Sequence, residues 1–172
     1  MIDDFAIIFE RPELWIGRPP AIINLAALTV GAALMPYTGL SPVESFNQVF
    51  GTVKMRFTPT LNTWAHASYG VIRFRNANVI TLPLVIHELW HLFGVRAKNR
   101  PTKQLWDDRH TLNTLAASPW PGMHPPSLKG YNVVEQFCNA GEAWTLYLDN
   151  DSGALHAWFD AHMPAWVAEA MR

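Results

Sequence analysis

The most informative stretch of the sequence reads TLPLVIHELWHLFG and runs from Thr81 to Gly94. Thr81 can cap a helix, Pro83 is tolerated in a first helical turn, and Gly94 fits a C-terminal stop. The apolar residues between these positions predict a buried helix.

Two histidines and a glutamate lie in this apolar helix. His87 and His91 are four residues apart, so their side chains differ by about 40° around the helix axis and can reach one metal ion. Glu88 is offset by about 100° from His87, which places it beside the ion rather than bound to it. There it can take a proton from metal-bound water and later deliver it to a leaving amine. Three such side chains would be costly in an apolar helix without partners, which favours a metal site over a chance match.

A catalytic zinc ion needs a third protein ligand and one open position. A histidine at position 97 would complete the metzincin pattern H-E-x-x-H-x-x-G-x-x-H, but that residue is Ala97. The other common solution is a glutamate from a later helix, and Glu135 is the best candidate. Glu142 lies seven residues further on and shares its helix face, so it is the first alternative. The remaining candidates are His110, His124, Asp107 and Asp108.

The two motifs together resemble the gluzincin branch of the zincin metallopeptidases. In this sequence His87-Glu88-x-x-His91 is followed 44 residues later (135 − 91) by Glu135, in a segment rich in aromatic residues. The segment is similar to the Y-x-x-x-E-D-F-A-E stretch of several small zinc peptidases, with amides at Gln136 and Asn139 where that stretch has acids. The resemblance covers about residues 68 to 148.

The resemblance implies a role for each matching residue. His87, His91 and Glu135 are the implied zinc ligands, and Glu88 is the implied general base. Tyr131 is implied as a stabiliser of the tetrahedral oxyanion, because a phenol can donate to developing negative charge.

Hydrophobic periodicity and capping signals predict the other elements. A first long helix is expected from Ala21 to Leu34, and a short one from Pro42 to Phe50 with Ser41 and Glu44 as a capping box. Alternating apolar residues predict strands around 53–57 and 69–74. Further helices are expected at about 102–117, 133–148 and 155–171, the last interrupted or kinked at Pro164, with a proline-rich loop at 118–126.

These elements predict one α+β domain over residues 1–172, with a zincin-like fold. We expect a small twisted sheet of three or four strands, backed by the helix 21–34 and the metal helix, and then a mainly helical C-terminal part that supplies Glu135. Trp90 is expected to face away from the metal and pack against the sheet or the helix 21–34. Cys138 points about 60° away from Glu135 and is expected in the core rather than as a ligand.

The amino-acid composition argues against two classes of partner, nucleic acids and membranes. The chain has 172 residues, 49% apolar and 16% charged, with a net charge of −1, so it can bury a full core and has no basic patch for nucleic acid. The apolar run from Ala21 to Met35 has 15 residues, fewer than the roughly 20 that cross a bilayer, so no membrane partner is expected. The single cysteine and the absence of a recognisable signal sequence favour a cytoplasmic location.

The sequence therefore predicts a zinc-dependent peptidase acting on a peptide or protein substrate. The strand from Ser68 to Phe74 is the candidate edge strand for pairing with an extended peptide. Two alternatives stay open: a non-catalytic module in which Glu142 or His124 closes a structural zinc site, and a zincin fold acting on a non-protein substrate. No signal for an oligomeric state is present.

Overall fold

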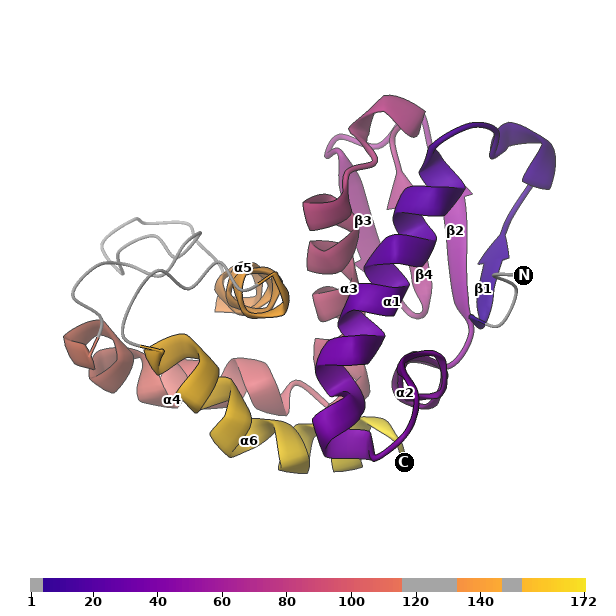
Figure 1. The fold of residues 1–172 in the computed structure, drawn as a ribbon. Coiled ribbons are helices and arrows are strands. Elements are labelled where there is room, and N and C mark those ends of the chain that lie inside the picture. The colour runs from indigo at the N-terminus through magenta and orange to yellow at the C-terminus, as the bar shows by residue number, and fades with distance from the viewer. Residues whose placement is uncertain (1–4, 116–132, 147–152) are drawn as a thin grey trace.

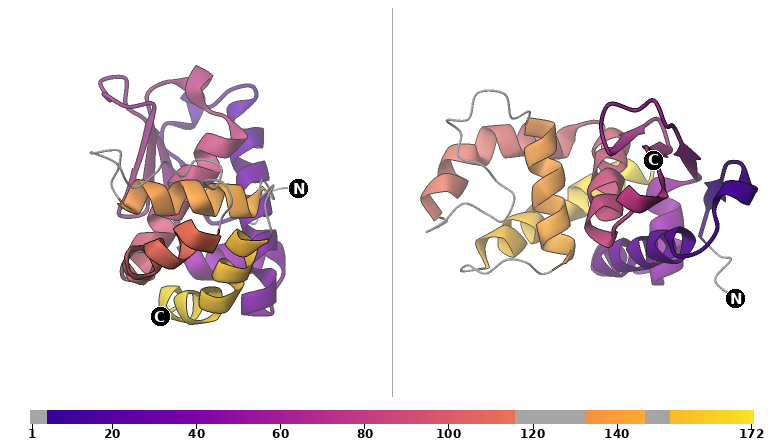
Figure 2. Two further views of the ribbon diagram at one scale, coloured as in Figure 1. Left: turned by 90° about the vertical axis from the view of Figure 1, so that its left-hand side faces the viewer. Right: turned by 90° about the horizontal axis from the view of Figure 1, so that it is seen from above.

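A four-stranded mixed sheet and six α-helices make up residues 5–115, 133–146 and 153–172, which the computed structural model describes. The chain is therefore an α+β protein, as predicted. Figure 1 shows the sheet beside helices α1, α2 and α3, with α4 on the far side of the molecule and α6 running below from α4 to α1. Helix α5 lies between α3 and α4, and the left view of Figure 2 shows it from the side.

The sheet has the strand order β1-β2-β4-β3. Strands β1 (Ile7–Phe9), β2 (Val53–Phe57) and β4 (Val71–Phe74) run parallel to one another, while β3 (Ala65–Ser68) is antiparallel to β4. Strand β3 forms one edge of this sheet. It contacts the helix that carries the two histidines.

The prediction that residues 68–74 form an edge strand is wrong. Strand β4 pairs with β2 on one side and β3 on the other, so its backbone groups are already used. Tyr69 is not extended either, because Tyr69 and Gly70 form the two-residue turn of the β3–β4 hairpin, with φ angles of 48° and 74°. Two left-handed residues in such a turn match the right-handed twist of the paired strands.

Helix α1 (Pro19–Thr38) is longer than predicted and contains Pro36 in its last turn. A proline so close to the helix end removes little bonding, and the Thr38 hydroxyl adds a bond to the Leu34 carbonyl at 3.3 Å. The helix thus exceeds the 15-residue run on which the argument against a membrane span rested. By length and composition, α1 is the one helix in the described residues that could cross a membrane. Of its most apolar 18-residue stretch, 33% is buried in the protein.

Helix α2 (Pro42–Phe50) has the predicted bounds. The Ser41 hydroxyl accepts from the Glu44 backbone N–H at 3.4 Å, and the Glu44 carboxylate accepts from the Ser41 N–H at 3.1 Å. This confirms the capping box.

Helix α3 (Leu82–Arg96) begins after Thr81 as predicted, but it runs past Gly94. The turn comes later, at Lys98 and Asn99, whose φ angles are 52° and 57°. Asn tolerates this left-handed conformation better than most residues. Helix α4 (Arg100–Leu115) follows at once.

The last two helices are α5 (Val133–Thr145) and α6 (Ala154–Ala170). Helix α6 starts directly after Gly153, whose φ of 73° is easily reached by glycine. Pro164 lies inside α6 and the helix continues through it, so an interruption there is wrong, and the alternative of a kink stays a prediction.

An aromatic cluster holds α5 and α6 against α3. The Trp90 ring lies 5.7 Å from Phe137, 5.7 Å from Trp144 and 5.6 Å from Phe159, measured between ring centroids. Its indole N–H donates to the Thr145 hydroxyl at 2.9 Å. The prediction that Trp90 packs against the sheet or α1 is not confirmed by its aromatic contacts, which join it to α5 and α6. This packing fixes the helix that carries Glu135.

Candidate metal centre

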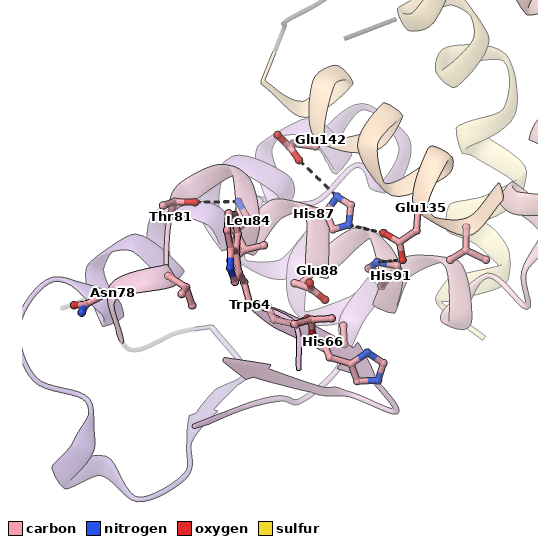
Figure 3. Close-up of a pocket in the computed structure, with 15 residues that line it drawn as sticks. Trp64, His66, Asn78, Thr81, Leu84, His87, Glu88, His91, Glu135 and Glu142 are labelled. Atoms are coloured by element: carbon pink, nitrogen blue, oxygen red, sulfur yellow. Dashed lines mark hydrogen bonds and ion pairs between the residues drawn. The ribbon is translucent and has the colours of Figure 1, made fainter. Parts of the chain in front are cut away.

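Helices α3 and α5 bring His87, His91 and Glu135 together, although 44 residues separate the last two in sequence. Nε2 of His87 lies 3.2 Å from one Glu135 carboxylate oxygen, and Nε2 of His91 lies 3.4 Å from the other. Figure 3 shows both imidazoles turned towards this carboxylate.

The spacing of these atoms fits a zinc ion. Ligand atoms about 2.0–2.1 Å from a tetrahedral ion lie about 3.3–3.4 Å from one another. The two nitrogen–oxygen distances, 3.2 and 3.4 Å, are close to that length, although they run to different oxygens of the Glu135 carboxylate. Among the described residues, the group with one donor atom each, all within 4.8 Å of one another, is His87, His91 and Cys138. Two imidazoles and one carboxylate are also a donor set that zinc takes in catalytic sites.

Glu88 lies beside this group in a buried position. The residue is only 5% exposed, and its Oε2 atom has no hydrogen-bond partner among the described residues. Burial raises the pKa of Glu88, whereas His91, His87 and a hydrogen bond with the Ala67 backbone act in the opposite direction. A buried carboxylate oxygen without a partner is costly. It therefore fits a group that receives a proton from a bound ligand or water.

Glu142 contacts the other edge of the His87 ring. Its carboxylate lies 3.6 Å from Nδ1 of His87, so the imidazole stands between two glutamates from α5 (Figure 3). Burial lowers the pKa of His87, but the hydrogen bonds to Glu135 and Glu142 outweigh it and raise the pKa to about 9. The bonds to His87 and His91 hold the pKa of Glu135 well below its usual range.

Cys138 also faces the histidines, one helical turn after Glu135. Its Sγ atom and one nitrogen of each of His87 and His91 all lie within 4.8 Å of one another. The side chain is fully buried, and burial raises the pKa of the thiol, with the negative charges of Glu135 and Glu88 adding to the effect. Cys138 is thus in the core as expected. The angle of about 60° between Cys138 and Glu135 around the helix axis does not keep Cys138 out of the site. Helix α5 crosses α3 so closely that both side chains reach the histidines.

A cavity of about 940 Å³ opens in front of this group. Strand β3, the short 3-10 helix η2 (Ala77–Val79), α3 and α5 supply its walls. Trp64 lines it while 68% exposed, and no Lys or Arg is among the described lining residues. Sequence reasoning missed the β3 wall, since this strand has only four residues and its apolar members, Ala65 and Ala67, are small.

The other candidates from the sequence lie elsewhere or outside the described residues. Asp107 pairs with Lys103 at 2.8 Å, and Asp108 accepts from the Trp158 indole at 2.8 Å; neither lines the cavity. Tyr131 and His124 lie outside the described residues, as does the side chain of His110.

Comparison of the chain with protein-family models, curated proteins and solved structures finds no match.

Proposed function

We propose that the protein is a zinc-dependent peptidase of the gluzincin type with a zincin-like fold. The observation that carries the proposal is the Glu135 carboxylate, whose two oxygens lie 3.2 and 3.4 Å from the ring nitrogens of His87 and His91, within reach of one ion. The Oε2 atom of buried Glu88 beside them, which has no partner in the part of the chain that the structure describes, supports it independently. A long helix, a small mixed sheet and an edge strand next to the histidine helix are consistent with such a fold.

The proposed chemistry divides between the ion and the chain. Zinc bound by His87, His91 and Glu135 would supply a Lewis acid that lowers the pKa of water and polarises a carbonyl group. Glu88 accepts the proton of the attacking water and then gives it to the leaving amine, so the carboxylate returns to its starting state. Glu142, whose carboxylate lies 3.6 Å from Nδ1 of His87, would accept the Nδ1 proton when the site tightens around the ion and leave Nε2 unprotonated for the ion.

The proposed substrate is an extended peptide that lies along strand β3. An edge strand offers unpaired backbone N–H and C=O groups to such a peptide. Three β3 residues, Ala65, His66 and Ala67, line the cavity next to Glu88, so a peptide paired there would pass the proposed base. The edge strand used is β3 and not the segment 68–74.

A second candidate function is a non-catalytic zinc module. Structural zinc sites have four protein ligands and no open position. The observation in its favour is Cys138, whose sulfur and one nitrogen of each histidine all lie within 4.8 Å of one another. Together with Glu135, the thiolate would make a fourth donor.

The substitution Glu88→Gln tests the peptidase proposal. An amide at this position cannot accept the proton, so we expect hydrolysis of a mixed peptide library to fall by about 10²–10⁴-fold. Zinc per chain, measured by elemental analysis, should stay unchanged. Asp107→Asn is the matched control, since Asp107 lies away from the cavity. An unchanged rate in Glu88→Gln, or no hydrolysis by the wild-type protein loaded with zinc, would overturn the proposal in favour of the non-catalytic module.

A further inference from the structure

We propose that Cys138 is a metal ligand, whose thiolate binds the ion held by His87 and His91 from the buried side of the site. The inference rests on the proposed metal binding by the two histidines, but it does not depend on peptidase activity. It adds a sulfur donor to the set of two histidines and one glutamate. With four protein donors bound, the ion would have no open coordination position.

The geometry around the histidine pair carries the inference. Sγ of Cys138 and one nitrogen of each histidine are mutually within 4.8 Å. With zinc–sulfur and zinc–nitrogen bonds of about 2.3 and 2.0–2.1 Å, the sulfur and nitrogen atoms of a tetrahedral site lie about 3.5 Å apart. Rotation about the cysteine χ1 bond and small shifts of the imidazoles cover the remaining difference.

A second observation on the same side of the site points to a ligand. Glu88 is 5% exposed, and its Oε2 atom has no partner among the described residues although Glu88 lines the cavity. The thiol lies close enough to Glu88 and Glu135 to sense both charges. A positive ion between these groups would remove the cost of holding two carboxylates and a thiol together.

The two donors that come from α5, Glu135 and Cys138, differ in their exposure to solvent. The side chain of Glu135 is 45% exposed, whereas Cys138 is fully buried. With both bound, the ion has four protein donors and no open position. Glu135 or Cys138 must then leave before water or a carbonyl can bind, so the fully ligated form is a resting state of the site.

Binding of the thiol is an acid–base step and needs no oxidant or reductant. The S–H bond breaks, the sulfur keeps the electron pair and forms the bond to the ion, and the proton passes to the buffer. Thiolate is a soft ligand, so the set of His87, His91 and Cys138 should favour softer ions than a set with only nitrogen and oxygen donors.

Cobalt(II) titration of the full chain tests the inference by absorption spectroscopy. Co²⁺ takes zinc sites, and its visible d–d bands report binding, whereas a thiolate-to-cobalt charge-transfer band in the near ultraviolet reports a bound sulfur. We expect both signals in the wild type. Cys138→Ala and Cys138→Ser should keep the d–d bands and lose the charge-transfer band, and Glu135→Ala should keep the charge-transfer band.

The possible failures are distinct. Visible bands without a charge-transfer band in the wild type would overturn the role of Cys138 and leave the histidine and glutamate site standing. No cobalt absorption of either kind would overturn the metal site itself, and with it the proposed function. Far-ultraviolet circular dichroism of each variant shows whether it is folded. Cys138→Ser nearly keeps the size of the side chain. If Cys138→Ala does not fold, Cys138→Ser therefore still tests whether the sulfur binds the ion.

Discussion

At the scale of single residues, His87 shows how one imidazole can be fixed for metal binding. Glu135 contacts its Nε2 atom at 3.2 Å and Glu142 its Nδ1 atom at 3.6 Å. A carboxylate on the ring nitrogen that does not bind metal sets the tautomer and orientation of the ring. In the proposed metal centre, the two glutamates therefore have different roles, whereas the sequence could only rank them as competing third ligands.

Replacing Glu142 separates these roles. We expect Glu142→Ala to weaken zinc binding by about 10–100-fold, the usual effect of losing such a partner. Glu142→Gln should lose less, because its amide oxygen can still accept from Nδ1. Affinity is measured by competition with a chromophoric chelator, and Glu13→Gln, an exposed change away from the cavity, is the control. Unchanged affinity in Glu142→Ala would refute the positioning role, and complete loss there but not in Glu135→Ala would make Glu142 the third ligand.

The residues of the candidate site could be predicted from the sequence to different extents. The spacing of His87 and His91 brings them together on any helix, so their proximity could be predicted from the sequence. The position of Glu135 depended on a resemblance, because nothing local states how α5 crosses α3. Cys138 was set aside on its helical angle, a one-helix argument that ignores how closely the partner helix approaches.

At the scale of elements, the contact between α3 and α5 depends on a glycine. A Cβ atom at Gly141 would lie 2.4 Å from the nearest atom of the Trp90 ring. Such a distance is far inside van der Waals contact, so the two helices can approach only with glycine there. The same approach brings Glu135 and Cys138 to the histidines.

Gly141→Ala should therefore weaken both the fold and the site. Overpacking of this kind costs about 1–3 kcal/mol of unfolding free energy, and displacement of α5 should also lower zinc affinity. The matched control is Gly94→Ala in α3, where a Cβ would be 3.9 Å from the nearest atom, of Phe137. That variant should be neutral or up to about 1 kcal/mol more stable, because alanine favours a helix interior. Thermal unfolding with and without zinc measures both effects, and equal behaviour of the two variants would contradict this account of α5.

Elements with local signals could be predicted from the sequence, and those without could not. The capping box gave the start of α2 to the residue, because both bonds form within four residues, and Gly51 gave its end. Strands β1 and β3 were missed, since each is short and owes its existence to pairing with a neighbour. Gly94 looked like a helix end but lies within α3, because α3 packs against α5 along that face.

At the scale of the whole molecule, Glu169 ties the last helix to the junction between α3 and α4. Its buried carboxylate pairs with Lys98, with Arg100 at 3.0 Å and with Arg172 at 3.4 Å. The hydrogen bond from Lys98 lowers the pKa of Glu169, and the charges of Arg100, Lys98 and Arg172 add to it against the effect of burial. The charged form is therefore the one that the fold favours.

The sign of the pH dependence follows from this lowered pKa. The stabilising contribution is fully present above the unfolded pKa of about 4.5 and is lost as the pH falls through the lower folded value. Glu169→Gln should reduce the melting temperature at pH 7, and the difference from the wild type should shrink as the pH falls below about 4.5. Melting curves from pH 7 to pH 3 measure this, with Glu13→Gln as the control at an exposed position. A difference that stays constant with pH would show that packing, not charge, is what Glu169 contributes.

Metal removal distinguishes a catalytic ion from a structural one across the whole molecule. The core of aromatic and aliphatic side chains is continuous from the sheet to α6, so the fold should persist without zinc. A ligand that binds only the folded state at 100 times its Kd adds about 2.7 kcal/mol, which corresponds to roughly 5–11 °C in a chain of this length. We therefore expect chelation to lower the melting temperature by that amount and leave a cooperative transition and an unchanged far-ultraviolet spectrum. Loss of cooperative unfolding on chelation would instead favour the non-catalytic module, because only a site whose ligands hold α3 and α5 together would take the fold with it.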